Sequence, residues 1–266
     1  GDRGGNFVVQ NSDLLLVLGC RLDIRQIGYN FKAFASEAIK IVVDIDDAEL
    51  QKHTISPCLQ INADVSDFLR ELLASLGGNP LEHKTKWIEW CRERKDRYPA
   101  VLPEYWNWES LVNPYCFVEE LGRQLPEESM VVCGNATACI VPFQALPIKR
   151  GMRLFSNSGT ASMGYDLPAA IGACIATGKP VVCIAGDGSI QMNLQELQTI
   201  VHHQLPIKIF VLNNRGYHSI RQTQSNFFDR LVGCDSWSGV NCPDMRRIAN
   251  AYRIPHDSCS KHCDLV

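Results

Sequence analysis

Two short apolar runs in the second half of the chain, residues 181–185 and 207–212, each end in a polar turn. The first run is followed by Gly-Asp-Gly at 186–188, and the second by Asn213 and Asn214. Mainly apolar runs of this length, the second broken only by Lys208, are typical of strands that are buried in a parallel sheet. The pattern therefore predicts two parallel strands with polar residues at their carboxyl ends.

The segment between these strands carries apolar residues at helical spacing, at positions 194, 197, 200 and 201. Asn193 and Glu196 have the spacing of a capping box, which predicts that the helix begins there. A strand, a helix and a second strand in this order form a right-handed crossover, and both strands then end at the same edge of the sheet. We therefore expect Asp187 and Asn214 to converge.

Strand and helix patterns alternate along most of the chain. In the first part of the chain, the pattern predicts strands at 14–18, 41–45 and 59–61 and helices at 48–52 and 66–76. In the second part, it predicts a helix at 115–124, a strand at 130–133 and a helix of small residues at 167–176. This alternation predicts an α/β protein with mainly parallel sheets.

A charged stretch and an aromatic, proline-rich stretch separate the two parts. We predict a first domain over residues 1–80, a linker over 81–113 and a second domain over 114–266. Four tryptophans lie in the linker, at positions 87, 90, 106 and 108. Because aromatic rings bury large areas, we expect them to attach the linker to its domains rather than to bind a ligand.

Composition and charge exclude several classes of protein. Of the 266 residues, 45% are hydrophobic, and 26 basic residues against 29 acidic ones give a net charge of -3. This balance provides no basic surface for nucleic acid or an anionic membrane, and no apolar run reaches the roughly 18 residues that span a bilayer. We expect neither a nucleic-acid partner nor a membrane partner.

Twelve cysteines are a high number for this length. Cys133, Cys174 and Cys183 are flanked by apolar residues, which favours buried thiols over a disulfide framework. With no visible signal peptide, we expect a reducing cytoplasmic location.

A second group, Cys259, His262 and Cys263 with His256 before it, consists of residue types that bind zinc. The spacing is irregular and no second Cys-x-x-Cys pair is present, so we interpret the group as a surface turn.

Asp187 and Asn214 are the strongest candidates for binding chemistry. A carboxylate and an amide oxygen beside a glycine-rich turn suit a hard cation such as Mg²⁺. Gly186 and Gly188 let a ligand approach the backbone, and the start of the following helix offers free N–H groups to an anion. A Gly-Asp-Gly triplet alone is a common turn. Its combination with Asn-Asn after 24 residues is more specific and would suit a diphosphate bridged by Mg²⁺.

Three regions together resemble the thiamine diphosphate-dependent enzymes, in particular the acetolactate synthase-like branch. They are residues 19–28 with 42–50, the loop and helix NSGTASMGYDLPAAIGA at 157–173, and GDGSIQMNLQELQT at 186–199 through to Asn213 and Asn214. The resemblance covers essentially the whole chain. It implies two Rossmann-like, thiamine diphosphate-fold domains, both incomplete: the later part of the middle domain and a truncated diphosphate-binding domain.

The resemblance implies a metal site at Asp187, the side chain of Asn214 and the carbonyl of Gly216. It places Met163 as the catalytic residue that supports the bent cofactor, with the backbone of Ala161 and Met163 facing the aminopyrimidine. The implied cofactor-binding residues are Gly134, Asn135, Ala136, Ala161, Met163, Gly186, Asp187, Gly188, Ser189, Asn214, Gly216, Tyr217 and His218.

In the first domain, the resemblance implies a site for FAD or ADP. A strand-terminal acid that accepts hydrogen bonds from ribose hydroxyls is consistent with this type of site. Similar domains also bind no nucleotide, and then the charged residues would form surface ion pairs. The implied residues are Gly19, Arg21, Asp23, Arg25, Asp44, Ile45 and Asp64.

The implied reaction is thiamine diphosphate- and Mg²⁺-dependent decarboxylation of a 2-oxo acid, with pyruvate as the expected substrate, and carboligation to a second carbonyl compound. The alternatives are a non-ligating 2-oxo acid decarboxylase and a non-catalytic nucleotide-binding or assembly module. The active site is expected at a subunit interface of a homo-oligomer, a dimer or tetramer. The activating glutamate belongs to a pyrimidine-binding domain that we expect to precede Gly1, so the isolated chain should be inactive.

Two stretches depart from the acetolactate synthase pattern. A tryptophan between two glutamines is replaced by Thr223, and a Gln-His-Gln stretch is replaced by Asn135, Ala136 and Thr137. A hydroxyl in place of an indole removes apolar wall, which favours a larger or more polar second substrate.

Overall fold

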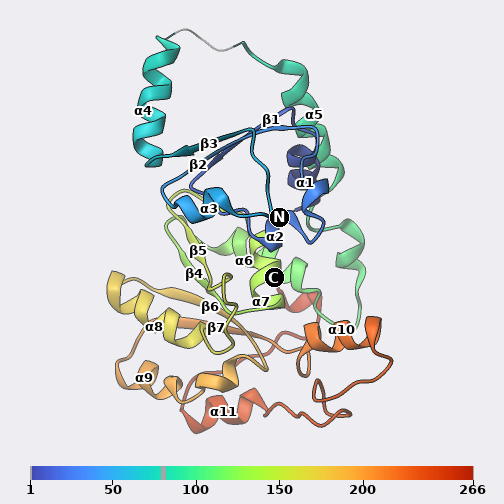
Figure 1. Cartoon of the computed structure of the whole chain (residues 1–266). Helices are drawn as coiled ribbons and strands as arrows, with labels where there is room; N and C mark the ends of the chain where they lie inside the picture. Colours follow the sequence, from blue (N-terminus) through green and yellow to red (C-terminus); the bar gives the residue numbers. More distant parts are fainter. Residues whose placement is uncertain (1, 79–81, 266) are drawn as a thin grey trace. The chain divides into compact units, whose positions relative to one another are not determined.

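The computed structural model describes residues 2–78 and 82–265. The chain divides into two compact units, Gly1–Ala100 and Val101–Val266. Each unit contains a parallel sheet with helices around it (Figure 1). The predicted α/β class with parallel sheets is therefore confirmed.

The first unit is built on a three-stranded parallel sheet in the order β1-β2-β3. Apolar side chains of β1 and β2, of the connection between them and of α3 form its core. The three predicted strands are present: β1 has the predicted ends, and the ends of β2 and β3 differ from the prediction by at most two residues. The elements are α1 (Arg3–Gln10), β1 (Leu14–Leu18), α2 (Ile24–Ile27), η1 (Phe31–Ala33), β2 (Ile39–Asp44), α3 (Asp47–Gln51), β3 (Leu59–Asn62), α4 (Val65–Leu76) and α5 (Thr85–Arg97).

The second unit is built on a four-stranded parallel sheet in the order β5-β4-β6-β7. Alternate residues of the central strands point to opposite faces, one covered by α8 and α9 and the other by α6 and α7. The elements are η2 (Pro103–Asn107), α6 (Pro114–Gln124), β4 (Met130–Cys133), α7 (Thr137–Ala145), β5 (Arg153–Phe155), α8 (Asp166–Thr177), β6 (Val181–Gly186), η3 (Ile190–Asn193), α9 (Glu196–His202), β7 (Ile207–Leu212), α10 (His218–Phe227), α11 (Met245–Ala251) and η4 (His262–Leu265).

The two strands that the sequence singles out are neighbours. β6 pairs with β7 in parallel, from Val181 opposite Ile207 to Gly186 opposite Leu212. The backbone N–H of Asp187 extends the pairing by donating to the carbonyl of Leu212 at 3.4 Å. The predicted convergence of the two strand ends at one sheet edge is therefore confirmed.

The predicted capping box before α9 is wrong. Residues 190–193 form the short 3₁₀ helix η3, and α9 has Gln195 at its N-cap without a side-chain cap. Asn193 instead donates from Nδ2 to the carbonyl of Gly164 at 2.7 Å, and Glu196 accepts from the Thr199 hydroxyl at 2.9 Å. The extra 3₁₀ turn moves Asn193 away from the helix start.

Aromatic residues of the predicted linker pack within both units. Trp87 and Trp90 stack on each other on α5 at 5.1 Å between ring centroids. Trp106 lies 5.5 Å from the His262 ring in the second unit, whereas Trp108 is half exposed. Trp106 therefore has the attaching role expected from the sequence.

Six of the twelve cysteines are buried, and all twelve are free thiols. Burial raises the pKa of the Cys133 and Cys183 thiols well above their usual range. These thiols stay protonated at neutral pH and fill core volume, as their apolar flanks predict. No helix in the described ranges is both long enough and apolar enough to cross a bilayer.

Candidate active site

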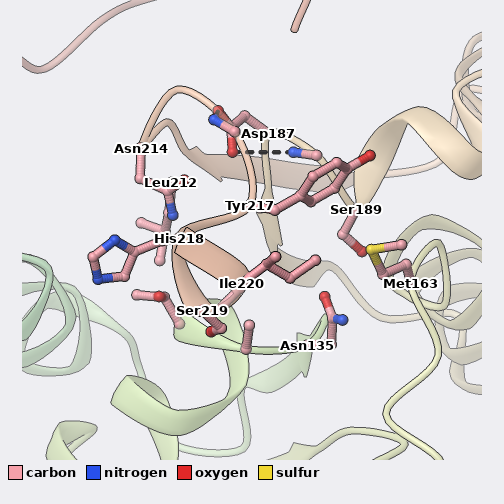
Figure 2. Close-up of a pocket in the computed structure, with 16 residues that line it drawn as sticks. Asn135, Met163, Asp187, Ser189, Leu212, Asn214, Tyr217, His218, Ser219 and Ile220 are labelled. Atoms are coloured by element: carbon pink, nitrogen blue, oxygen red, sulfur yellow. Dashed lines mark hydrogen bonds between the residues drawn. The ribbon is translucent and has the colours of Figure 1, made fainter. Parts of the chain in front are cut away.

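A pocket of about 120 Å³ lies at the edge of the four-stranded sheet where β6 and β7 end (Figure 2). It brings together the predicted cofactor-binding residues except Gly134 and Ala161, which adjoin it: Gly134 precedes Asn135, and Asn135 donates to the carbonyl of Ala161 at 3.3 Å. The lining residues are Asn135, Ala136, Thr137, Ala138, Met163, Gly186, Asp187, Gly188, Ser189, Leu212, Asn214, Gly216, Tyr217, His218, Ser219 and Ile220.

Asp187 joins the two halves of this pocket. Its side chain is buried, with Oδ1 accepting from the Gly188 N–H at 3.0 Å and Oδ2 accepting from the Gly216 N–H at 2.9 Å. The carboxylate thus ties the turn after β6 to the loop after β7. Burial and the negative charge of Asp187 also raise the pKa of the Cys242 thiol, which stays protonated beside it.

The Asn214 side chain is aimed at the same end of the pocket as Asp187 (Figure 2). Its Oδ1 atom is buried and finds no hydrogen-bond partner among the residues that the structure describes. A buried polar atom without a partner costs about 1–3 kcal/mol, so natural proteins rarely keep one without a reason. This oxygen is therefore a candidate ligand atom.

A brace outside the pocket holds the loop that carries Asn214. Arg221 of α10 donates to the backbone carbonyl of Asn214 at 3.0 Å and pairs with Asp235 at 3.3 Å. Hydrogen bonds from Ser238, together with Arg221, hold the pKa of the Asp235 carboxyl below its usual value. The Tyr217 N–H donates to the Cys234 carbonyl at 2.8 Å, so the segment around Asp235 supports the loop at two points.

The backbone around the pocket includes conformations that L-residues seldom adopt. Ala136, Ala161 and Arg215 have φ values of 50°, 52° and 60°. Such residues persist only where the surrounding structure imposes them, and they cluster at functional sites. Their positions beside the strand ends agree with a preformed binding site.

Two family models match the two parts of the chain. Residues 134–265 match "Thiamine pyrophosphate enzyme, C-terminal TPP binding domain", and residues 1–72 match "Thiamine pyrophosphate enzyme, central domain". The chain belongs to the thiamine pyrophosphate enzyme family. Thiamine pyrophosphate is a second name for thiamine diphosphate, and the first of these matches contains every pocket-lining residue.

Similar proteins include acetolactate synthase large subunits. That of Cyanidium caldarium is 38% identical over 259 residues, which are 96% of this chain and 43% of the relative. The isozyme 1 large subunit of Escherichia coli strain K12 is 32% identical over 240 residues, which are 90% of this chain and 41% of the relative. Acetolactate synthase 1, chloroplastic, of Zea mays is 33% identical over 256 residues, which are 94% of this chain and 40% of the relative. The chain thus spans about two fifths of the length of these relatives.

The donor atoms of this thiamine pyrophosphate enzyme pocket fit a hard divalent cation. Asp187 supplies a carboxylate, Gly216 a backbone carbonyl, and Asn214 an amide oxygen that has no partner among the described residues. Mg²⁺ prefers oxygen ligands and commonly shares them with substrate phosphates.

The residues implied for FAD or ADP gather at the carboxyl ends of β1, β2 and β3. Two of their carboxylates cap helices: Asp23 accepts from the Arg25 N–H at 2.8 Å, and Asp64 accepts from the Ser66 N–H at 2.7 Å. The backbone hydrogen bond from Ser66 lowers the pKa of Asp64. These caps explain two of the acids locally, whatever ligand the edge binds.

The carboxyl-terminal cysteines and histidines do not form a metal-binding group. His262 accepts from the Asn113 N–H at Nε2, at 2.9 Å, and its Nδ1 lies 3.0 Å from the carbonyl of Trp106. Both ring nitrogens are therefore engaged within the second unit. Within the described ranges, no three His, Cys, Asp or Glu side chains are placed together for a metal ion.

We expect Arg221→Gln to weaken Mg²⁺-dependent binding of thiamine diphosphate about tenfold, because a charge-assisted hydrogen bond contributes about 1.5–3 kcal/mol. The change removes the ion pair with Asp235 and loosens the Asn214 backbone. Calorimetric titration of the intact protein measures the effect. Arg247→Gln is the control, since Arg247 is 88% exposed and its ion pair is 4.0 Å long. Equal affinity in both variants would contradict the inference that Arg221 supports the Asn214 loop.

Proposed function

We propose that the chain carries the metal- and diphosphate-binding part of a thiamine diphosphate- and Mg²⁺-dependent active site. In the whole protein, this site decarboxylates a 2-oxo acid, with pyruvate as the substrate, and joins the product to a second carbonyl compound. The convergence of Asp187 with the unpartnered oxygen of Asn214 carries the proposal. Similarity to acetolactate synthase large subunits supports the reaction class.

Different residues of the pocket would bind the metal ion and support the cofactor. Asp187, Asn214 and the carbonyl of Gly216 would hold Mg²⁺ at the sheet edge, next to the diphosphate. When bound, thiamine diphosphate supplies the carbanion stabilisation that loss of CO₂ from a 2-oxo acid requires. Met163 lies away from Asp187 in the pocket (Figure 2), and its side chain, which is 42% exposed, would support the cofactor from there.

We propose that a further surface completes the site in a homo-oligomer. The pocket of about 120 Å³ is smaller than the roughly 300–1,000 Å³ that enclose drug-sized ligands. Its lining, among the described residues, contains no glutamate, and Glu196 is engaged with Thr199 instead. The activating glutamate and the remaining wall would then come from residues outside this chain.

The second substrate is proposed to be larger or more polar than a 2-oxo acid. Ser219 and Ile220 line the pocket from the first turn of α10, and Thr223 follows one turn later on the same helix face. Thr223 is exposed and stands where the resemblance expects tryptophan. The missing indole leaves room for an acceptor such as a sugar or another aldehyde.

Product analysis tests this function. We expect the intact protein to release CO₂ from pyruvate only with Mg²⁺ and thiamine diphosphate, and to form a carbon–carbon bond with an aldehyde or sugar acceptor. Acetaldehyde as the sole product would favour a non-ligating decarboxylase. Rapid acetolactate formation with no use of other acceptors would show that the interpretation of Thr223 is wrong.

FAD or ADP is proposed for the first unit, at the edge formed by β1, β2 and β3. Asp44 ends β2 and is nearly buried, and Ile45 beside it is 71% exposed, an arrangement that suits a nucleotide lying across the strand end. The visible absorbance of flavin in the same purified protein decides whether FAD is present. Its absence, with no ADP binding in a titration, would contradict the proposal.

A further inference from the structure

Asp166, the first residue of α8, is a fully buried carboxylate beneath the pocket. It forms no ion pair with any residue that the structure describes. Its Oδ2 accepts from the Ser189 hydroxyl at 2.8 Å, and its Oδ1 accepts from the Leu167 N–H at 3.0 Å. It does not line the pocket itself, so it can act only through its neighbours.

Ser189 links Asp166 to the segment that carries Met163. The Ser189 hydroxyl accepts from the Gly164 N–H at 2.9 Å, and Asn193 donates to the Gly164 carbonyl at 2.7 Å. Gly164 has a φ of +79°, and a Cβ there would lie 2.6 Å from the Cβ of Met192. Both polar groups of the residue after Met163 are therefore fixed to the segment that follows the Gly-Asp-Gly turn.

A second contact joins Asp166 to the end of β4. A Cβ on Gly134 would lie only 2.8 Å from Oδ2 of Asp166, so the carboxylate packs directly against this backbone. The Gly134 N–H in turn donates to the carbonyl of Ile184 on β6 at 2.8 Å. The carboxylate thus contacts the segments at 134–136 and 186–189 directly, and it is linked to the segment at 163–164 through the Ser189 hydroxyl.

Burying the Asp166 carboxylate in the core costs desolvation free energy. Burial raises the pKa of Asp166, while its hydrogen bonds to Ser189 and Leu167 act in the opposite direction. The free N–H groups at the start of α8 favour a negative charge there. A small apolar residue would avoid the desolvation cost altogether, so the position is better explained by the geometry that it imposes than by stability.

We propose that Asp166 is a positioning residue that, through Ser189, locks the Met163 segment onto the Gly-Asp-Gly turn and so sets the spacing between the two ends of the pocket. The identity of the ligand rests on the function proposed above, but the hydrogen-bond relay does not. One consequence is that the Ser189 hydroxyl donates its proton to Asp166 and is not a donor for a phosphate.

Hydrogen exchange in the intact protein without cofactor tests the relay. Asparagine offers one acceptor oxygen to the two donors, so Asp166→Asn should raise the exchange rate of the Gly164 amide at least tenfold. Ser189→Ala should do the same, and the double variant should add little, because both remove one chain of contacts. Unchanged Gly164 exchange in the folded Ser189→Ala variant would overturn the proposal, even if Asp166→Asn does not fold.

Cofactor titration and kinetics supply the second readout. Asp166→Asn should bind thiamine diphosphate with Mg²⁺ about tenfold more weakly, and kcat should fall more than KM for the 2-oxo acid changes. Ile200→Val, in the same core, should lower thermal stability without altering Gly164 exchange or cofactor affinity. Wild-type protein that binds no cofactor would contradict the proposed function. Wild-type and Asp166→Asn proteins that bind equally well would overturn the role of Asp166.

Discussion

Replacing Asp187 with alanine is expected to lower the affinity for thiamine diphosphate, in the presence of Mg²⁺, by at least about 100-fold, or about 2.7 kcal/mol. Asp187 is the sole acidic side chain among the described residues that line the pocket. Its loss removes the charge that attracts the cation and leaves the N–H groups of Gly188 and Gly216 without their acceptor. Each buried, unpaired N–H costs about 1–3 kcal/mol, so the loop after β7 should also loosen.

Two further variants make the result specific. Asp187→Asn keeps the shape and one acceptor oxygen but loses the charge, so its affinity should lie between those of the wild type and the alanine variant. Asp244→Ala removes the N-cap of α11, outside the pocket, and should cost about 1 kcal/mol of stability without changing binding. Calorimetry on the intact protein measures all three. Normal Mg²⁺-dependent binding by Asp187→Ala would contradict the role of Asp187 as a metal ligand, whereas no binding by the wild type would favour a nucleotide-binding or assembly module.

The strand–helix–strand unit could be predicted from the sequence because its signals are local. Two apolar runs and a right-handed crossover suffice to bring Gly186 and Leu212 to one sheet edge. The edge strand β5, in contrast, has only three residues, too few for a period to show. Helix α10 is mostly polar, so its apolar pattern is weak, although it carries Ser219 and Ile220 into the pocket.

The contacts that support the site could not be predicted, because they join residues that are distant in the sequence. Arg221 and Asp235 are 14 residues apart, and Asp166 and Ser189 are 23 apart. Asp166 does leave a signal, since it is a lone acid at the start of a helix of small apolar residues. The spacing of Asn193 and Glu196 gave a wrong prediction for a different reason. A capping box is defined by backbone geometry, which spacing alone does not fix.

Gly216→Ala is expected to destabilise the loop after β7, which we propose to bind Mg²⁺, and to lower cofactor affinity by about 10- to 100-fold, or about 1.4–2.7 kcal/mol. Gly216 has a φ of +130°, and a Cβ there would lie 2.3 Å from the Cys234 carbonyl oxygen and 3.2 Å from Cα of Asp235. These are backbone atoms held by the Arg221–Asp235 brace, so they cannot simply turn aside. Moving the loop would break the Asp187 hydrogen bond to the Gly216 N–H.

Gly239→Ala is the matched control for this change. Gly239 also has a φ that strains an L-residue, +109°, but no atom of the described residues lies within 4 Å of a Cβ built on it. The backbone strain in Gly239→Ala should therefore lower its stability by only about 1–3 kcal/mol, and the variant should keep its affinity for Mg²⁺ and thiamine diphosphate. Chemical unfolding and calorimetric titration of both variants separate the two effects. If both variants lost affinity equally, backbone strain rather than the clash with Cys234 would be the cause, and the close packing of this loop would not explain cofactor binding.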